Sequence, residues 1–200
     1  IPDPCIGDKY CAGGVFDDMP AASDWMHEGI DYCVLFGLMN GVGKNQFDPM
    51  GQTTRAMFVS ILYRMADEPD VSELPEAPFV DVSDDTWYTA AVRWAYANKV
   101  VLGTDDTHFA PDARLTRAQL VTMLYRAYGP EKGVRPRPIG GYTDWNTVPD
   151  WAYPATTWAV SMGILYGTTR TELSPNTGAN RAQLALFMMR TCRLQGELDS

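Results

Sequence analysis

The stretch that decides how this chain folds is FAPDARLTRAQL, at residues 109–120. It recurs as FDPMGQTTRAMF at 47–58 and as LSPNTGANRAQL at 173–184. The shared arginines, Arg55, Arg117 and Arg181, are 62 and then 64 residues apart. Because self-similarity at a fixed period is the mark of a repeat architecture, the sequence predicts three tandem copies of one module.

Four further kinds of residue recur in each module. An aromatic residue and an aspartate come first, then a tryptophan, then a glycine. The aspartates are Asp18, Asp81 and Asp144, the tryptophans are Trp25, Trp87 and Trp151, and the glycines are Gly41, Gly103 and Gly167. We therefore divide the chain into a cysteine-containing head (1–15), modules at 16–66, 79–128 and 142–194, linkers at 67–78 and 129–141, and a tail (195–200). Both linkers are rich in Pro with Gly or acidic residues, which is typical of surface segments.

Each module is predicted to be a helix, a loop and a second helix. In the first helix, small residues follow the tryptophan at helical spacing, as in Trp87, Ala91 and Ala95. The second helix begins at a residue suited to an N-cap, namely Thr54, Thr116 or Asn180. Gln119 and Gln183 complete a capping box, which Met57 cannot do. The fold class is mainly α, and modules this small are expected to pack on one another.

The charge balance excludes several classes of partner. The chain has 16 Lys and Arg against 25 Asp and Glu, a net charge of −9. Nonspecific binding to nucleic acid or to an anionic membrane surface needs a basic patch, so we expect neither. The uncharged stretch at 151–169 contains Pro154 and Gly163, and we expect no membrane insertion. Like charge opposes self-association, so we expect a monomer.

The four cysteines, Cys5, Cys11, Cys33 and Cys192, have no metal-ligand spacing. An even number favours two disulfides if the chain is secreted, with four unrelated thiols as the alternative. The sequence allows three connectivities and does not choose among them. No cofactor and no metal site is expected.

The arginine after each N-cap lies where the helix dipole disfavours a cation by about 0.3–1 kcal/mol. One explanation is structural: Arg55, Arg117 and Arg181 pair with the carboxylates of Asp18, Asp81 and Asp144. The other is functional, because a guanidinium beside the free N–H groups of a helix start is a strong site for a carboxylate or phosphate of a ligand. The sequence leaves both open.

The aromatic residues divide in a similar way. We expect the tryptophans that begin each small-residue stripe, Trp25, Trp87 and Trp151, to be buried in the core. Seven residues later stand Tyr32, Trp94 and Trp158, off the stripe. These are interpreted as faces available to a sugar ring, with burial as an equal alternative.

An enzyme is not expected. His27 and His108 neither recur between modules nor belong to a metal motif, and no Gly-x-Ser-x-Gly or phosphate-loop pattern is present. A glycosidase-type carboxylate pair is the weaker alternative.

The repeated motif resembles the S-layer homology (SLH) domain family. The second module carries it most fully, with FVDV (79–82), Trp87, Gly103, FAP (109–111) and LTRAQL (115–120). The resemblance implies a pseudo-threefold trefoil in which the second helices form a central three-helix bundle. The family's Glu is replaced by Met57, Gln119 and Gln183.

The resemblance also implies a function. Members hold exported bacterial proteins noncovalently on the cell wall by binding secondary cell-wall polysaccharide, often pyruvylated, in grooves between modules. A pyruvate ketal is a carboxylate on a sugar, which suits the repeated arginines. The ligand residues implied are Arg55, Arg117, Arg181, Asp18, Asp81, Asp144, Gly41, Gly103 and Gly167, to which we add Trp94 and Trp158. The alternative is an adhesin or a factor that binds a host or immune protein.

Within this family pattern the cysteines are additions, because none recurs between modules: Cys33 stands where the other two have Ala95 and Ala159. Cys5 and Cys11 lie in the head, and Cys192 is near the end of the third module. We therefore expect disulfides that attach the head and close the ring of modules.

Overall fold

The computed structural model describes residues 11–129 and 139–198, and within them the chain is mainly helical with no strand. The helices of the three modules are α1 (His27–Leu35) and α2 (Arg55–Met65), α3 (Thr89–Ala97) and α4 (Arg117–Tyr128), and α5 (Tyr153–Ser161) and α6 (Arg181–Leu198). Short 3-10 helices lie at η1 (Ala12–Val15), η2 (Trp145–Thr147) and η3 (Asp150–Ala152). The predicted helix-loop-helix repeat is confirmed. The third module's helix continues through much of the predicted tail, as far as Leu198.

The chain forms two compact units that do not coincide with the modules. The first unit contains residues 1–53 and 179–200, and the second contains residues 54–178. The chain passes from the first unit to the second just before α2 and returns to the first just before α6. The two helices of the first module, α1 and α2, therefore belong to different units. The module boundaries therefore describe the repeat rather than the packing, and they stay a prediction.

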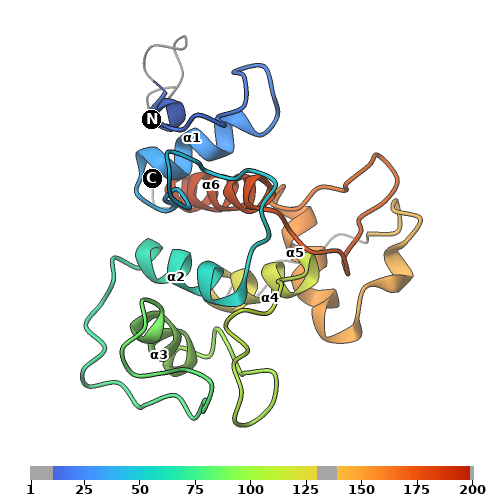
Figure 1. Ribbon diagram of the computed structural model, residues 1–200. Helices are drawn as coiled ribbons and strands as arrows, with labels where there is room; N and C mark the ends of the chain where they lie inside the picture. Colours follow the sequence, from blue (N-terminus) through green and yellow to red (C-terminus); the bar gives the residue numbers. More distant parts are fainter. Residues whose placement is uncertain (1–10, 130–138, 199–200) are drawn as a thin grey trace. The chain divides into compact units, whose positions relative to one another are not determined.

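Helices pair between neighbouring modules. In the first unit α1 packs against α6; in the second, α3 packs against α2 and α5 against α4 (Figure 1). The small-residue stripe makes these close approaches possible. A Cβ at Gly29 would overlap the backbone of Leu186 on α6, and Ala95 and Ala159 are fully buried. Packing between modules is thus confirmed, whereas the trefoil and its central bundle stay a prediction.

The helix ends follow the expected chemistry. The Oγ1 of Thr116 accepts from Gln119 N at 3.2 Å, while Gln119 Oε1 accepts from Thr116 N at 3.0 Å. Asn180 and Gln183 make the same capping box in the third module. Thr54 accepts only from the N–H of Met57, at 3.3 Å, as the missing Gln predicts.

In each module the residue two positions after the end of the first helix has a left-handed backbone conformation. Gly37 has φ of 66° and Gly163 has φ of 69°, which glycine adopts without steric cost. The equivalent residue in the second module is Lys99, at φ 60°. A glycine in the sequence therefore predicts the end of the first helix in two of the three modules.

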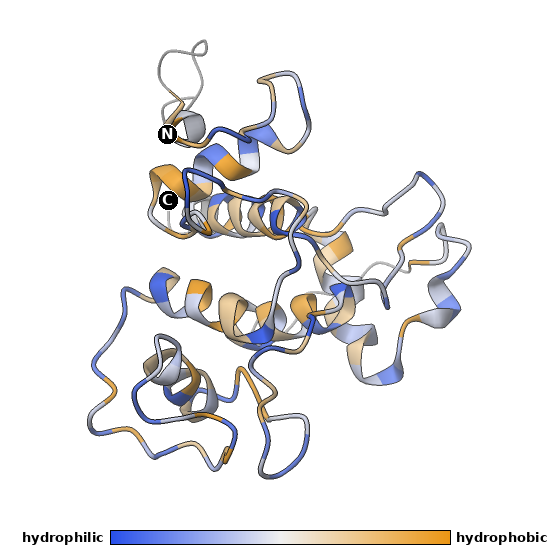
Figure 2. Cartoon of the chain, in the orientation of Figure 1, coloured by the Kyte–Doolittle hydropathy of each residue, from blue (hydrophilic) through white to orange (hydrophobic). Residues whose placement is uncertain are grey.

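The aromatic set that we expected in the core is exposed, and for the other set the alternative, burial, is what the structure shows. Figure 2 shows hydrophobic residues on the helices of both units. Trp94 and Trp158, which lie in α3 and α5, are only 9% and 3% exposed. Their rings pack against Tyr63 and Tyr125 of the preceding module, with centroids 5.8 and 5.5 Å apart. The other set, Trp25, Trp87 and Trp151, is more than half exposed.

The physical reason lies in where the helices begin. Trp25 and Trp87 precede the first residues of α1 and α3 by two positions, and Trp151 lies in η3. These residues are outside the helical period from which burial was inferred. The interpretation of Trp94 and Trp158 as open sugar-facing surfaces is therefore wrong.

The expected disulfides are not present in the part of the chain that the structure describes. No disulfide joins any two of Cys11, Cys33 and Cys192, and Cys5 lies outside the described residues. The Sγ of Cys33 donates to Ala185 O at 3.4 Å, and burial raises the pKa of both Cys33 and Cys192. Of the described helices, none has the length and apolar character needed to cross a membrane.

Candidate functional site

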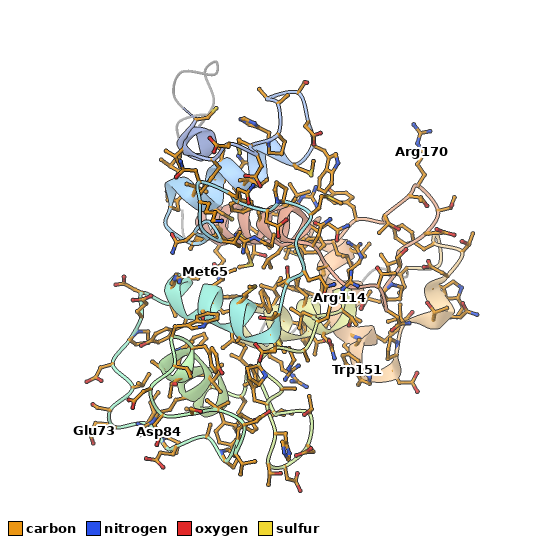
Figure 3. The ribbon with its side chains drawn as sticks, in the orientation of Figure 1. Met65, Glu73, Asp84, Arg114, Trp151 and Arg170 are labelled. Carbon is orange, nitrogen blue, oxygen red and sulfur yellow. The ribbon has the colours of Figure 1, made fainter. Side chains whose placement is uncertain are left out.

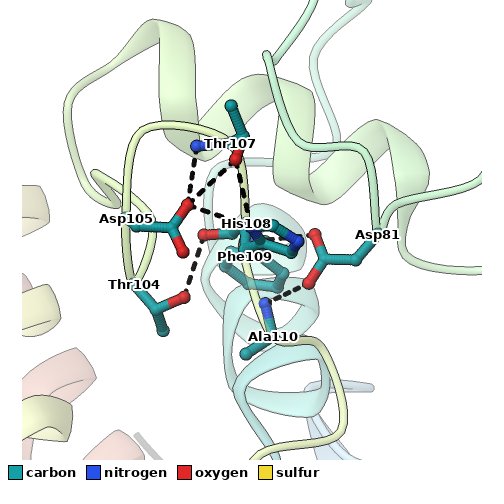
Figure 4. Close-up of polar contacts among 7 residues, drawn as sticks. All are labelled: Asp81, Thr104, Asp105, Thr107, His108, Phe109 and Ala110. Carbon is teal, nitrogen blue, oxygen red and sulfur yellow. Dashed lines mark hydrogen bonds and ion pairs between the residues drawn. The ribbon is translucent and has the colours of Figure 1, made fainter.

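The repeated aspartates each hold the loop that leads to their own module's second helix. Figure 4 shows the second module, where the two carboxylate oxygens of Asp81 accept from the N–H groups of Phe109 and Ala110, at 2.8 and 2.7 Å. The same pair of bonds, 2.7–2.8 Å long, joins Asp18 to residues 47 and 48 and Asp144 to residues 173 and 174. We call this arrangement the aspartate clamp.

The clamp fixes a strained position. The second residue that it binds precedes a proline and is left-handed, with φ of 57° at Asp48, 56° at Ala110 and 52° at Ser174. For a residue other than glycine this conformation costs roughly 1–2 kcal/mol. Charge-assisted hydrogen bonds from two consecutive N–H groups offset that cost.

The clamp also sets the charge of its aspartates. Burial alone would raise the pKa of Asp81, but the hydrogen bonds from the Phe109 and Ala110 backbone outweigh burial and lower it. The pKa of Asp144 is lowered in the same way, with Arg117 contributing. Both carboxylates are therefore ionised at neutral pH.

The repeated arginines bind the same loops from the other side. The Nε of Arg55 donates to Phe109 O at 2.7 Å, that of Arg117 to Leu173 O at 3.2 Å, and that of Arg181 to Phe47 O at 2.7 Å. Each of these carbonyls belongs to the residue whose N–H the aspartate binds. The arginines do join a loop to a helix, but the group that each Nε hydrogen-bonds is a backbone carbonyl of the neighbouring module and not the aspartate carboxylate that we expected.

Two of the arginines make a second bond to a carbonyl. The Nη2 of Arg181 donates to Asn40 O at 2.6 Å, and that of Arg117 to Tyr166 O at 2.5 Å. Both acceptors directly precede the repeated glycine. In the second module the equivalent carbonyl is that of Leu102, and Arg55 makes no such bond within the described residues. Its guanidinium lies over the Phe109 ring, 4.8 Å from the centroid.

Arg55 instead faces a cavity of about 370 Å³ in the second unit, which we call the arginine cavity. The side chains and backbone that line it include Gly103, Thr104, Gln119, Arg126 and Trp151, and no carboxylate lines it. Arg55 is only 5% exposed. Burial lowers its pKa, attraction to Asp81 offsets part of that effect, and repulsion from Arg126 lowers the pKa further.

Arg126 adds a second guanidinium to the arginine cavity. Among the residues that the structure describes it has no hydrogen-bond or ion-pair partner. Unlike Arg55 it is exposed, although partial desolvation by its neighbours still lowers its pKa. Two cations that repel each other across a cavity without a carboxylate are favourable surroundings for an anion. A pattern in the sequence could have identified Arg126. Each of the repeated arginines is followed, nine positions later, by another arginine: Arg64, Arg126 and Arg190.

Trp151 gives the arginine cavity an aromatic surface. It lies in η3, which packs on α4, and is 55% exposed (Figure 3). An indole that is held by neighbouring backbone and exposed on one side can stack against the apolar face of a sugar ring. The site therefore combines two guanidinium groups, the amide of Gln119 and an aromatic face.

The repeated glycines have a packing role. A Cβ at Gly41, Gly103 or Gly167 would overlap the aromatic ring that begins the same module, namely Phe16, Phe79 or Tyr142. Gly103 also lines the arginine cavity. Of the residues predicted to bind ligand, the structure thus brings Arg55 and Gly103 to one cavity and places Trp94 and Trp158 in the core.

The chain resembles known proteins in the same three segments. The S-layer homology domain family matches residues 15–57, 78–121 and 141–185. An S-layer protein of Bacillus thuringiensis subsp. finitimus is 28% identical over 90% of this chain and 21% of its own length. An amylopullulanase of Thermoanaerobacterium thermosulfurigenes is 26% identical over 82% of the chain and 9% of its length. An endoglucanase of Bacillus sp. (strain KSM-635) is 33% identical over 61% of the chain and 12% of its length. The chain thus spans at most about a fifth of each of these relatives.

Proposed function

Because the chain belongs to the S-layer homology domain family, a binding module with an extracellular, cell-wall-associated role, we propose that the arginine cavity binds an acidic secondary cell-wall polysaccharide. The acidic group is a carboxylate on a sugar, such as a pyruvate ketal. The chain then acts as a noncovalent wall anchor rather than as an enzyme, and we expect it to be monomeric.

One observation carries this proposal: Arg55 is buried with its terminal amino groups unpartnered in the described part of the chain, and Arg126 shares its cavity. A hydrogen bond that involves a charged group contributes about 1.5–3 kcal/mol, more than most neutral ones. A carboxylate between the two guanidinium groups would also remove their mutual repulsion. The sugar that carries it would stack on Trp151, and the cavity volume lies in the range of about 300–1,000 Å³ that is typical of small-ligand sites.

The test is sedimentation with purified cell-wall sacculi of a bacterium that displays S-layer homology proteins. Walls that retain their secondary polymer are compared with walls from which hydrofluoric acid has removed it. We expect binding to the first and none to the second. Binding to neither would contradict the anchor and favour the alternative role, an adhesin or a factor that contacts a host protein.

Arg126→Ala separates ligand binding from loop structure, because Arg126 makes no hydrogen bond in the described residues. We expect affinity for intact walls to fall about tenfold or more, the effect of losing one charged hydrogen bond. The matched control is Arg170→Ala, which removes the same charge from an exposed loop of the second unit (Figure 3). If both variants lost affinity equally, net charge rather than the cavity would explain binding.

A further inference from the structure

Asn40 and Gly41, in the first unit, form a dipeptide in which two groups that can react with each other are both unengaged. Both residues are exposed. Within the described residues, neither the side-chain amide of Asn40 nor the backbone N–H of Gly41 makes a hydrogen bond. In the third module the equivalent N–H, that of Gly167, donates to the hydroxyl of Tyr142 at 3.2 Å. The corresponding aromatic residue of the first module is Phe16, which has no hydroxyl to accept the N–H of Gly41.

The order of these two residues permits a reaction within the chain. The backbone nitrogen of the residue that follows an asparagine can attack the side-chain amide carbon and close an imide ring. A side chain on the following residue hinders this approach, and glycine has none. Among the asparagines of the chain, Asn40 is the one that a glycine follows. The second and third modules have Leu102 and Tyr166 before their repeated glycine, so the reactive pair belongs to the first module alone.

A guanidinium group lies on the carbonyl oxygen of the same peptide bond. The Nη2 of Arg181 donates to Asn40 O at 2.6 Å, and Arg181 is only 6% exposed, so water screens its charge little. When the nitrogen of Gly41 loses its proton, the negative charge is shared with Asn40 O, the oxygen of that peptide group. A charged donor that is already placed on this oxygen stabilises the anion and therefore favours the attack.

We propose that Asn40–Gly41 is a self-modifying site, at which Arg181 promotes the conversion of Asn40 to isoaspartate. The nitrogen of Gly41, having given its proton to hydroxide, bonds to Asn40 Cγ. The Cγ–Nδ2 bond breaks, and Nδ2 takes a proton from water and leaves as ammonia, which restores the hydroxide. One water molecule then adds to the imide at the carbon that bears Asn40 O, because Arg181 polarises that carbonyl, and the bond from this carbon to the nitrogen of Gly41 breaks. No atom is oxidised or reduced.

The product differs from the original chain in two ways. Asn40 O becomes one oxygen of a free carboxylate, so the neutral acceptor of Arg181 becomes a charged one and the hydrogen bond becomes an ion pair. The backbone now reaches Gly41 through Cβ and Cγ and is one methylene longer. Gly41 packs so closely on the Phe16 ring that it has no room for a Cβ, so the longer chain must displace this contact. The reaction needs only water and therefore advances with the age of the protein.

The experiment follows the asparagines of the full chain during incubation at mildly alkaline pH, in buffer and in urea. Peptide mass spectrometry with electron-transfer fragmentation distinguishes asparagine, aspartate and isoaspartate. We expect Asn40 to convert mainly to isoaspartate in the folded protein. Asn45 is the internal control, because it is exposed in the same loop but is followed by Gln46, and it should stay unchanged on that timescale. In urea, where the contact with Arg181 is lost, Asn40 should convert more slowly and give a larger share of aspartate.

Arg181→Lys tests the role of the guanidinium, because a single ammonium cannot reproduce its bonds to two separate carbonyls. In this variant Asn40 should convert about tenfold more slowly, the effect of losing one charged hydrogen bond. The matched control is Arg193→Lys, which changes another arginine of α6 and should leave the rate unchanged. An unchanged rate and product in folded Arg181→Lys would overturn the proposal. If that variant unfolds, the unmodified chain decides, and conversion in buffer that is no faster than in urea overturns it.

Discussion

Arg181 in the first unit and Arg55 in the second occupy the same position of the repeat, yet their surroundings differ. Arg181 donates to two backbone carbonyls, those of Phe47 and Asn40, and lies over the Phe47 ring. Arg55 donates to one carbonyl and turns the rest of its guanidinium to the arginine cavity. The two copies of the repeated arginine therefore differ in hydrogen-bond saturation, and in the proposed function it is the less saturated copy, Arg55, that binds the ligand.

The largest expected effect comes from comparing two tryptophans, the buried Trp158 and the exposed Trp151. Trp158→Ala removes a buried ring that packs on Tyr125 and should lower the free energy of unfolding by about 3–5 kcal/mol. Trp151→Ala should lower it by less than about 1 kcal/mol, because that ring is exposed, while weakening wall binding. Urea denaturation and wall sedimentation of both variants check this. Equal destabilisation would show that Trp151 belongs to the framework.

The arginines themselves give the next largest effect. Arg181→Ala leaves two carbonyls without their donor and should destabilise the protein by about 3 kcal/mol, whereas Arg55→Ala leaves one and should cost about 1.5 kcal/mol. Wall affinity should follow the opposite order, with Arg55→Ala the more damaging. The same urea series measures stability, and sedimentation measures affinity. The comparison fails if Arg181→Ala reduces affinity more than Arg55→Ala does while staying folded.

Acid should weaken the framework through the aspartate clamps. The pKa values of Asp81 and Asp144 are lowered from 3.8 on folding, so their contribution is present above 3.8 and is lost as pH falls through the lower folded values. We expect the midpoint temperature of thermal unfolding to decrease when the pH is lowered below 4. Between pH 5 and 7 it should change little. Asp81→Asn should reduce this acid dependence. A midpoint that stays constant down to pH 2 would contradict the role of these carboxylates.

The smallest effect is a gain. Met57→Gln gives the first module the capping box that the other two already have and should stabilise the protein by about 0.5 kcal/mol. Gln119→Met should lose a similar amount in the second module. Thermal denaturation detects both changes. A neutral result for Met57→Gln would mean that the half-buried Met57 contributes packing equal to the cap.

The sequence predicted those parts of the fold that depend on local chemistry. Thr116 with Gln119, and Gly37 with Gly163, mark helix ends through interactions within a few residues. The sequence did not predict the packing partner of each module's first helix. The second helices of all three modules carry the same apolar pattern, so each is an equally suitable partner. Trp151 was misplaced because its helix begins after it and not at it.

The site was predictable only in part, for a related reason. Arg55 could be identified because it places a cation in the first turn of a helix, where the helix dipole disfavours positive charge. Its hydrogen-bond acceptor is a backbone carbonyl, which every residue has, so no sequence pattern could name it. Arg126 did recur in phase with the repeat, and its counterparts Arg64 and Arg190 could have identified it.

The pairing of α1 with α6 has a consequence for how the protein reaches its folded state. Cys33 and its hydrogen-bond acceptor Ala185 are 152 residues apart, and the first unit is built from both ends of the chain. A chain that is synthesised and exported in the direction from N- to C-terminus exposes the Gly29 face of α1 until α6 emerges. Contacts of such long sequence separation form slowly because loop closure precedes them. The second unit, whose residues are contiguous, can fold first, and the first unit closes only after residues 179–198 have followed it out of the cell.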